Sequence, residues 1–504
     1  MAGVHIKTLI ELKHFITPLL MPPTMTALTT TTAVNTTSGY DIVAIPQDAS
    51  SYLVEGTCFT SKTHVGWVGQ LLQLPKKFVL HMDSKFKLHH GEWVLTTIGT
   101  HMLRWDVHNS TLSTTFVPLV YMLCKQHESL GACKMLIDAL CLLASTYFGG
   151  AKLQPGACMA DHCDAFRAAY RAAFPTAAFG TCWPHIIRKW REGAYCKKTW
   201  AHFDDVTEHL QSIHLAHTAE MRDMLMHEFG KLWDQWGRQM DTFWNSYCKK
   251  DGGWDVWSIG IFDCMLCTPS QQAHESWHEQ IKRSKIPGML RASTEHLFKE
   301  SLPQLVMMDS IQIPSNLVFH VPAVPKKMIE KSLWYVQHSE THVHAFKNDD
   351  GEINFYVLRK DNTTGYKKIS PRLIEMYEAA SEGTKDRRIK DLAHLTDVCS
   401  SMHLLCPEHK DWGVPSCDLN PANLDCMHCK GFKGHGICSH VLAVNHIMKN
   451  VNLRHELMEI GQGVHKKGGN RKKSVPALTM APTREPDSSD EEFVRFLEQG
   501  AQGK

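Results

Sequence analysis

The chain has 504 residues, of which 43% are hydrophobic and 21% are charged, a balance typical of a folded protein with roughly two to four domains. The formal net charge of +2 excludes a strong basic field over the whole molecule, so any contact with nucleic acid has to be local. No signal peptide and no membrane span are predicted, because Lys7, Glu11 and Lys13 interrupt the apolar N-terminal stretch and no run of about 18 uncharged apolar residues follows. The 17 cysteines then indicate reduced thiols, some of them metal ligands, rather than a disulfide framework.

Residues 1–50 are rich in threonine and weakly patterned, and we predict a poorly ordered segment there. Residues 51–310 are expected to form one catalytic domain. Apolar runs alternate with helical patterns along it and predict, in chain order, strands Phe78–Asp83, Trp93–Met102 and Thr115–Leu123, helix Leu130–Tyr147, strand Ala157–Asp161, helix Ala165–Phe174 and strand Ala178–Cys182. Pro118 favours an edge or a bulge for part of the third strand.

Three antiparallel strands joined by short links, followed by helix, strand, helix and strand, form the order of an RNase H-like α/β core. In that topology the first and fourth strands lie side by side. We therefore expect Asp83 and Asp161, which end these two strands, to lie together although 78 residues separate them (161 minus 83).

Residues 188–262 are charged, rich in tryptophan and helical in pattern, and they predict an all-helical insertion. Apolar residues from Met221 to Tyr247 keep three- and four-residue steps, which indicates one long amphipathic helix packed by its apolar face. Beyond the insertion, polar residues precede a helix that carries Glu275.

The acids Asp83, Asp161 and Glu275 together predict a two-metal site for phosphoryl transfer. That chemistry needs carboxylates converging on two divalent ions, one activating the attacking oxygen and the other stabilising the leaving oxygen. Mg²⁺ or Mn²⁺ suits the task, because such ions take oxygen ligands and leave positions open for phosphate. Lys282 and Arg283 follow Glu275 and are expected to contact DNA phosphates. Each acid alone is more typical of a capping or solvated residue.

The region also resembles the catalytic domain of Mutator-like transposases over roughly residues 75–285. The resemblance rests on the segments VLHMDSKFKL, TTFVPLVYMLCKQHES, CMADHCDAFRAAYRAAFP, CWPHI and HESWHEQIKR. It implies a DDE triad of Asp83, Asp161 and Glu275, a Cys-x-x-His pair of Cys182 and His185, and a histidine after the glutamate at His278. The N-terminal DNA-binding module usual in that family is not recognised in this sequence. Its absence puts in doubt that the element can transpose independently.

Two other metal sites compete for residues of this region. His274-Glu275-Ser276-Trp277-His278 fits the zinc metalloprotease pattern H-E-x-x-H, with Glu295 or Glu300 as a third ligand, but this leaves the two aspartates unexplained. Cys264 and Cys267 could instead join Cys182 and His185 in a second, Cys₃His zinc site, and four buried side chains without metal are an equally good interpretation.

Residues 330–450 are expected to form a smaller α+β zinc-binding domain, and residues 463–504 a disordered tail that is basic first and then acidic. Its predicted elements are strands Leu333–Gln337, His342–Phe346 and Ile353–Leu358, and helix His440–Met448. The basic run Lys466–Lys473 fits a nuclear-import signal, a phosphate-contacting arm or a solvated charge run.

A cluster of four soft ligands near the C-terminus has the spacing Cys-x₂-Cys-x₈-Cys-x-His and predicts a tetrahedral zinc site of Cys426, Cys429, Cys438 and His440. It resembles the SWIM zinc finger, which accompanies Mutator-like transposases and binds DNA or protein. SWIM fingers carry Cys-x-Cys where this chain has Cys-x₂-Cys, so Cys417 or His428 could replace Cys426.

These expectations combine into a Mutator-like DDE transposase that cleaves and joins DNA with Mg²⁺ or Mn²⁺ and holds structural Zn²⁺. Its expected partners are transposon ends, target DNA and further copies of the same chain, without a membrane, and its expected location is the nucleus. The alternative is a domesticated or decayed relative that binds DNA or protein without cutting.

Overall fold

A computed structural model of the protein describes much of the chain in two compact units. The first unit comprises Met1–Arg104, Ser113–His320 and Asp411–Val414, and the second Trp105–Leu112, Val321–Lys410 and Pro415–Lys504. Within them the structure describes residues 42–45, 56–74, 78–85, 93–106, 109–125, 129–193, 196–237, 240–249, 254–262, 270–281, 293, 296–312, 320–321, 323–360, 365–407, 417–426 and 429–462. The predicted tail 463–504 lies outside these residues.

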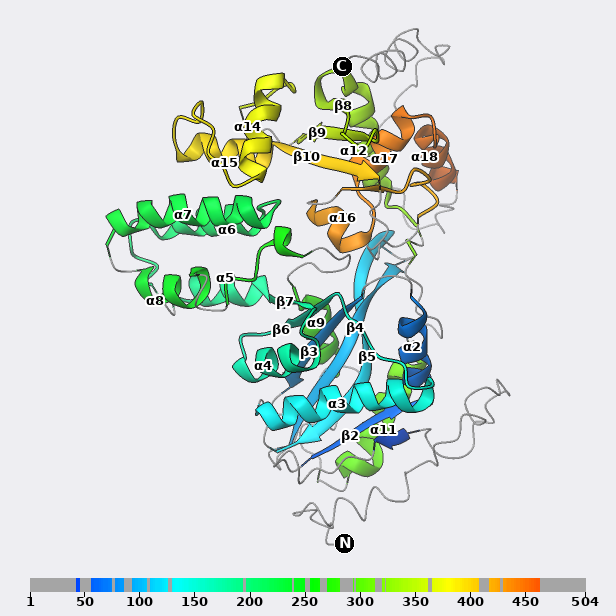
Figure 1. Ribbon diagram of the computed structural model, residues 1–504. Coiled ribbons are helices and arrows are strands. Elements are labelled where there is room, and N and C mark those ends of the chain that lie inside the picture. The colour runs from blue at the N-terminus through cyan, green and yellow to red at the C-terminus, as the bar shows by residue number, and fades with distance from the viewer. Residues whose placement is uncertain are drawn as a thin grey trace, which may run out of the picture. The chain divides into compact units, whose positions relative to one another are not determined.

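The first unit is a mixed α/β structure built on a seven-stranded sheet with the order β1-β2-β5-β4-β3-β6-β7 (Figure 1). Its strands are β1 (Ile42–Ile45), β2 (Gly56–Ser61), β3 (Val79–Lys85), β4 (Val94–Asp106), β5 (Thr111–Cys124), β6 (Ala157–Ala160) and β7 (Ala178–Thr181). β3 pairs antiparallel with β4 and parallel with β6, and β6 pairs parallel with β7. The five predicted strands are thus confirmed, and the first and fourth lie side by side as expected.

Side chains alternate between the two faces of the sheet along each strand. Apolar residues therefore lie on both faces, and helices cover both. On one face α2 (Lys62–Gln73), α3 (Leu130–Tyr147) and α4 (Asp164–Ala173) bury apolar residues against Leu80 and Met82 of β3. On the other face Trp277 of α9 (Gln272–Gln280), together with η10 (Leu297–Ser301) and α11 (Leu302–Gln312), packs against Phe59, Leu95 and Phe116. The sheet is therefore the middle layer of three.

Among the described residues, α3 is the one helix whose length and composition would let it cross a membrane, and half of it is buried. It carries Lys134 and Asp138, and its buried residues, such as Leu136 and Leu140, belong to the core beneath the sheet. Figure 1 shows α3 lying across the strands. A core helix of this kind meets the same apolar criterion as a membrane helix.

Between β7 and α9 the regular elements of the described residues are helices, in agreement with the predicted insertion. The elements are α5 (Trp183–Arg191), α6 (Phe203–His214), α7 (Ala219–Gln235), α8 (Asp241–Phe243), η5 (Trp244–Cys248) and η7 (Ile259–Ile261). The prediction of one long helix from Met221 to Tyr247 is wrong. The α7 helix ends at Gln235, and Gly237 follows with φ at 96°, a left-handed conformation that breaks the helix although the apolar spacing continues.

One further sequence prediction for the first unit needs correction. Residues 42–45, placed in a poorly ordered segment, form strand β1, which gains its hydrogen bonds from β2 rather than from any local pattern. The prediction of an edge or bulge for part of the third strand fits Pro118. This proline lies on β5, an interior strand of the sheet, but β2 pairs with residues 121–124 only, so the proline falls beyond that register.

The second unit is a smaller α+β structure with a four-stranded sheet ordered β11-β10-β9-β8. Its elements are α12 (Lys326–Gln337), α13 (Ser339–His342), β8 (Val343–Lys347), β9 (Ile353–Leu358), α14 (Pro371–Ser381), α15 (Leu392–Ser401), β10 (Met402–Pro407), β11 (Leu424–Asp425), α16 (Lys430–His435), α17 (Ser439–Ile447) and α18 (Leu453–Gln462). The strand predicted at Leu333–Gln337 is wrong, because Ile329, Ser332 and Tyr335 are buried at helical three-residue steps along α12.

A pair of stacked histidines lies fully buried in the sheet of the first unit. The rings of His81 on β3 and His101 on β4 have centroids 3.5 Å apart. Burial lowers the pKa of His101 to about 3, and burial followed by the neighbouring His101 lowers the pKa of His81 as well. Both rings are therefore neutral at physiological pH in the folded protein.

We predict that the first unit loses stability as the pH falls. In the unfolded chain these histidines take up protons near pH 6.5, but His101 in the folded protein does so only near pH 3. Their contribution is fully present above about pH 6.5 and then falls by about 1.4 kcal/mol per pH unit for each histidine. Urea unfolding of the full chain at about pH 7 and about pH 5 measures this loss.

His101→Phe keeps an aromatic ring in the stack and removes one titrating group, so its loss of stability between the two pH values should be smaller than that of the wild type. The control is His227→Phe, which changes an exposed histidine of α7. Equal pH dependence in all three proteins would contradict the prediction.

Candidate acidic site and cysteine-histidine cluster

Asp83 and Asp161 lie next to each other because their strands are paired in parallel with a constant offset. Val79 pairs with Ala157 and Met82 with Ala160, an offset of 78 residues that Asp83 and Asp161 continue (161 minus 83). Alternation along each strand places both aspartates on the face opposite Leu80 and Met82, since they share the parity of Val79 and Met159. This is the face on which α9 lies.

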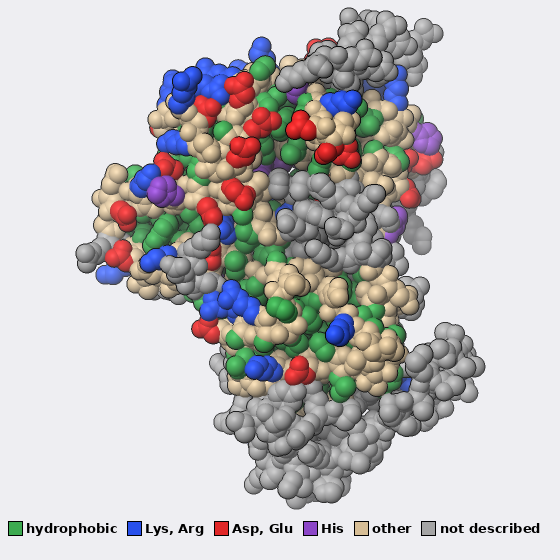
Figure 2. Space-filling view, in the orientation of Figure 1, with side chains coloured by type: hydrophobic (Ala, Val, Ile, Leu, Met, Phe, Trp, Pro, Cys, Tyr) green, Lys and Arg blue, Asp and Glu red, His purple; other side chains and the backbone are tan. Residues whose placement is uncertain are grey.

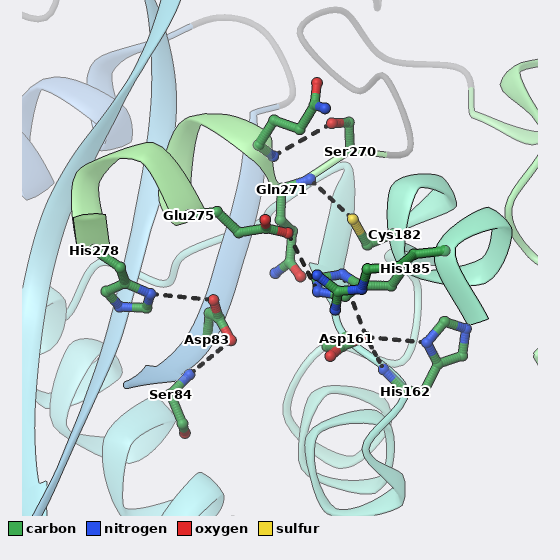
Figure 3. Close-up of polar contacts among 12 residues, drawn as sticks. Asp83, Ser84, Asp161, His162, Cys182, His185, Ser270, Gln271, Glu275 and His278 are labelled. Carbon is green, nitrogen blue, oxygen red and sulfur yellow. Dashed lines mark hydrogen bonds and ion pairs between the residues drawn. The ribbon is translucent and has the colours of Figure 1, made fainter. Parts of the chain in front are cut away.

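Glu275 reaches the same site from the first turns of α9. The residue before this helix, Gln271, donates from Nε2 to the carbonyl oxygens of Met82 (2.9 Å) and Met159 (3.3 Å) and so ties the helix to β3 and β6. One turn on, His274 is hydrogen-bonded through Nε2 to Thr97 Oγ1 of β4 at 2.6 Å. The three acids predicted from sequence are therefore brought together, and their carboxyl groups point into one space in Figure 3.

Three histidines hold these carboxylates. His278 Nδ1 lies 3.3 Å from Asp83 Oδ2, and His162 Nδ1 lies 3.0 Å from Asp161 Oδ1. His185 stands between two acids, with Nδ1 3.5 Å from Asp161 Oδ1 and Nε2 3.2 Å from Glu275 Oε1 (Figure 3). Each acid of the site thus has at least one imidazole beside it.

The histidines also set the charge of Asp161. Burial alone would raise the pKa of this carboxyl, but the hydrogen bond from His162 and the charges of His185 and His162 outweigh burial and lower the pKa. Burial lowers the pKa of His162, and Asp161 opposes that effect. Asp161 is therefore an ionised carboxylate over the physiological range, as a ligand for a cation has to be.

The three carboxylate side chains are partly exposed to solvent. The side chains of Asp83, Asp161 and Glu275 are 16%, 34% and 35% exposed. The described contacts to the Asp161 carboxylate fall on Oδ1, and the buried Glu275 Oε1 accepts no hydrogen bond from the described residues. Oxygen atoms in such a set are the donors that Mg²⁺ prefers.

Cys182 lies beside the acids at the start of α5. Its sulfur accepts a hydrogen bond from the backbone N–H of Gln271 at 3.3 Å, which joins the two ends of the helical insertion. The predicted zinc partners Cys264 and Cys267, and the predicted DNA contacts Lys282 and Arg283, lie outside the described residues.

The metalloprotease pattern is not assembled as a common metal site. His274 is fully buried, stacks on Phe116 with ring centroids 3.6 Å apart and bonds to Thr97, whereas His278 turns to Asp83. Glu300 pairs with His296 at 3.4 Å in an exposed position, and Glu295 lies outside the described residues. The described contacts of the two histidines thus serve sheet packing and the acidic site.

A second group of ligand side chains gathers in the C-terminal unit. Cys426 follows β11, Cys429 precedes α16, and Cys438 and His440 begin α17, with all four residues buried. His440 Nδ1 lies 3.7 Å from Cys426 Sγ and 3.6 Å from Cys438 Sγ, and its Nε2 lies 3.2 Å from the Tyr335 hydroxyl. A tetrahedral zinc ion with ordinary bond lengths would separate sulfur and nitrogen by about 3.6 Å. This buried Cys/His group could hold a metal ion such as zinc.

His403 of β10 adds a candidate that the sequence spacing does not indicate. Atoms of His403, Cys426, Cys429 and His440 lie within 4.8 Å of one another, a set that omits Cys438. We favour Cys438 as the fourth ligand, because its sulfur faces His440 Nδ1, whereas the His403 ring stacks on that of His440 with centroids 4.3 Å apart. Cys417 is not part of this group, and His428 lies outside the described residues.

Loss of one cysteine should empty this cluster. We predict that Cys429→Ser reduces the zinc content of the purified chain by about one equivalent, measured by elemental analysis, because three remaining ligands bind structural zinc poorly. Cys438→Ser should behave in the same way and His403→Ala should not.

Cys399→Ser is the control, since Cys399 is a buried thiol of α15 outside the cluster. Retention of zinc by Cys438→Ser together with its loss in His403→Ala would instead assign His403 as the ligand.

The sequence did not predict the roles of His162 and Gln271, nor the position of His185 between two acids. His162 adjoins Asp161, and this adjacency is a usable signal, whereas no pattern marks Gln271. No family model matches the chain, and no curated protein matches it.

Proposed function

We propose that the protein is a metal-dependent DNA-cleaving enzyme of the Mutator-like DDE type, with an RNase H-like core. The observation that carries the proposal is the meeting of Asp83, Asp161 and Glu275 on one face of the sheet. Counted from β3, the strands β5-β4-β3-β6-β7 follow the order 3-2-1-4-5, which is consistent with such a core.

In this proposal Asp83, Asp161 and Glu275 would hold two Mg²⁺ or Mn²⁺ ions. Bound there, the ions would activate the attacking oxygen and stabilise the leaving oxygen of a phosphodiester. His278 orients Asp83, and His162 keeps Asp161 ionised through a hydrogen bond of 3.0 Å. The two hydrogen bonds from Gln271 hold the start of α9 on β3 and β6, and so hold Glu275 close to the ends of these strands. Two-metal chemistry requires carboxylates held in place in this way.

Contact with DNA would come from local basic surfaces, since the net charge of the chain is only +2. Lys282 and Arg283, which follow Glu275 in the sequence, remain predicted contacts. The second unit adds exposed basic residues on and around α14, namely Lys367, Lys368, Arg372, Lys385, Arg387 and Lys390. Figure 2 shows Lys and Arg side chains gathered over α14 and α15.

We further propose that zinc bound by Cys426, Cys429, Cys438 and His440 makes the second unit a SWIM-type module for binding DNA or protein. The partners would be transposon ends, target DNA and other copies of the chain, and the location the nucleus. The position of His185 favours a second candidate, a DNA-binding relative without cleavage, because the imidazole occupies the space between Asp161 and Glu275.

Nicking of supercoiled plasmid by the full chain with Mg²⁺ or Mn²⁺ tests the proposal. Asp83→Asn, Asp161→Asn and Glu275→Gln should each lower the rate on the order of 10²- to 10³-fold, because bound metal supplies several kcal/mol of transition-state stabilisation.

Asp164→Asn is the matched control. This exposed acid begins α4 close to Asp161 and pairs with Arg167 at 2.6 Å. Nicking should be unchanged in this variant. A folded wild-type chain that binds plasmid but does not nick it with Mg²⁺ or Mn²⁺ would favour the second candidate, which binds DNA without cleaving it.

A further inference from the structure

A second metal site overlaps the acidic site. One atom each of Cys182, His185 and Glu275 lies within 4.8 Å of the others. Cys182 is fully buried and His185 is 7% exposed, while Glu275 is open to solvent on one side. A thiol, an imidazole and a carboxylate form a donor set that suits zinc better than Mg²⁺, which seldom takes sulfur or nitrogen.

His185 already has the orientation of a zinc ligand. Its Nε2 lies 3.2 Å from Glu275 Oε1, close to the about 3.4 Å that separates nitrogen and oxygen around tetrahedral zinc. Its Nδ1 faces Asp161 Oδ1 at 3.5 Å, and a carboxylate behind a ligating histidine is the usual means of fixing the ring. Asp161 would thus support this site without entering it.

The surroundings of Cys182 favour its thiolate form when a cation is bound beside it. It precedes the first turn of α5, and its sulfur accepts the backbone N–H of Gln271 at 3.3 Å. Both features stabilise negative charge on sulfur. Burial raises the pKa of the thiol, and the nearby carboxylates of Glu275 and Asp161 raise it further, so that ionisation needs a positive partner.

We propose that Zn²⁺, or another thiophilic divalent ion, binds Cys182 Sγ, His185 Nε2 and Glu275 Oε1, the three ligands that the described residues supply. Zinc held at Glu275 Oε1 would draw this carboxylate toward Cys182 and His185 and away from the two aspartates, so we expect zinc to inhibit cleavage. The inhibition rests on the proposed nuclease function, whereas zinc binding does not.

Zinc titration of the chelator-treated full chain tests the binding. The wild type should take up one equivalent more than Cys182→Ser, and Glu275→Gln should bind this equivalent at least about 10-fold more weakly. In the wild type, cobalt titration should produce a thiolate-to-metal absorption band from both metal sites. In Cys182→Ser the band should be weaker, because only the C-terminal cluster then contributes.

Cys248→Ser, a change of another buried thiol of the first unit, should keep both equivalents. The site is refuted if Cys182→Ser keeps the full zinc content. Unchanged affinity in Glu275→Gln also overturns the proposal, because Glu275 is then not a ligand.

Plasmid nicking at fixed Mg²⁺ with rising zinc tests the inhibition. The zinc concentration that halves the rate should be at least about 10-fold higher for Cys182→Ser than for the wild type. Equal inhibition of both proteins would overturn the competition. A chain that nicks under no condition would refute the nuclease function, while the zinc titration would still decide the metal site.

Discussion

The parallel pairing of β3 with β6 is the constraint on which the acidic site depends. Its constant offset of 78 residues places Asp83 beside Asp161, and side-chain alternation turns both toward α9. A slip of one residue in either strand would turn its aspartate to the opposite face and into the apolar layer with Leu80 and Met82. That layer enforces the register, because burying a carboxylate among those residues is costly.

Histidine chemistry links this register to the charge of the site. His162, His185 and His278 each place a ring nitrogen within 3.5 Å of a carboxylate oxygen of this partly buried cluster. His185 has the most consequential position, since its two nitrogens serve two different acids. His185 therefore contacts two acids of the site and also lies beside the thiol of Cys182.

Periodic patterns predicted most of the first unit, whereas features fixed by tertiary contacts escaped them. α3 was predicted with its observed bounds because its apolar residues recur at helical spacing. In the structure Ser129 caps its start. β1 has no such pattern and depends on pairing with β2, and the apolar run of α12 resembles a strand until its buried residues are known. The acids could be predicted because they end apolar strands. Gln271 could not, since its role is to bond two carbonyl groups that are distant in sequence.

The bond between Gln271 and Cys182 has a consequence for how this architecture can diversify. Residues 89 positions apart meet at 3.3 Å, so the helical segment leaves the sheet and returns to almost the same point. The whole excursion is not free to vary, because Phe262 near its end packs against Val79, Ala157 and Met159 of the sheet and Val256 accepts a backbone hydrogen bond from Thr181. Its outer helices, α6 and α7, could be exchanged over evolutionary time without displacing Glu275, which makes them a natural place for new recognition surfaces to arise.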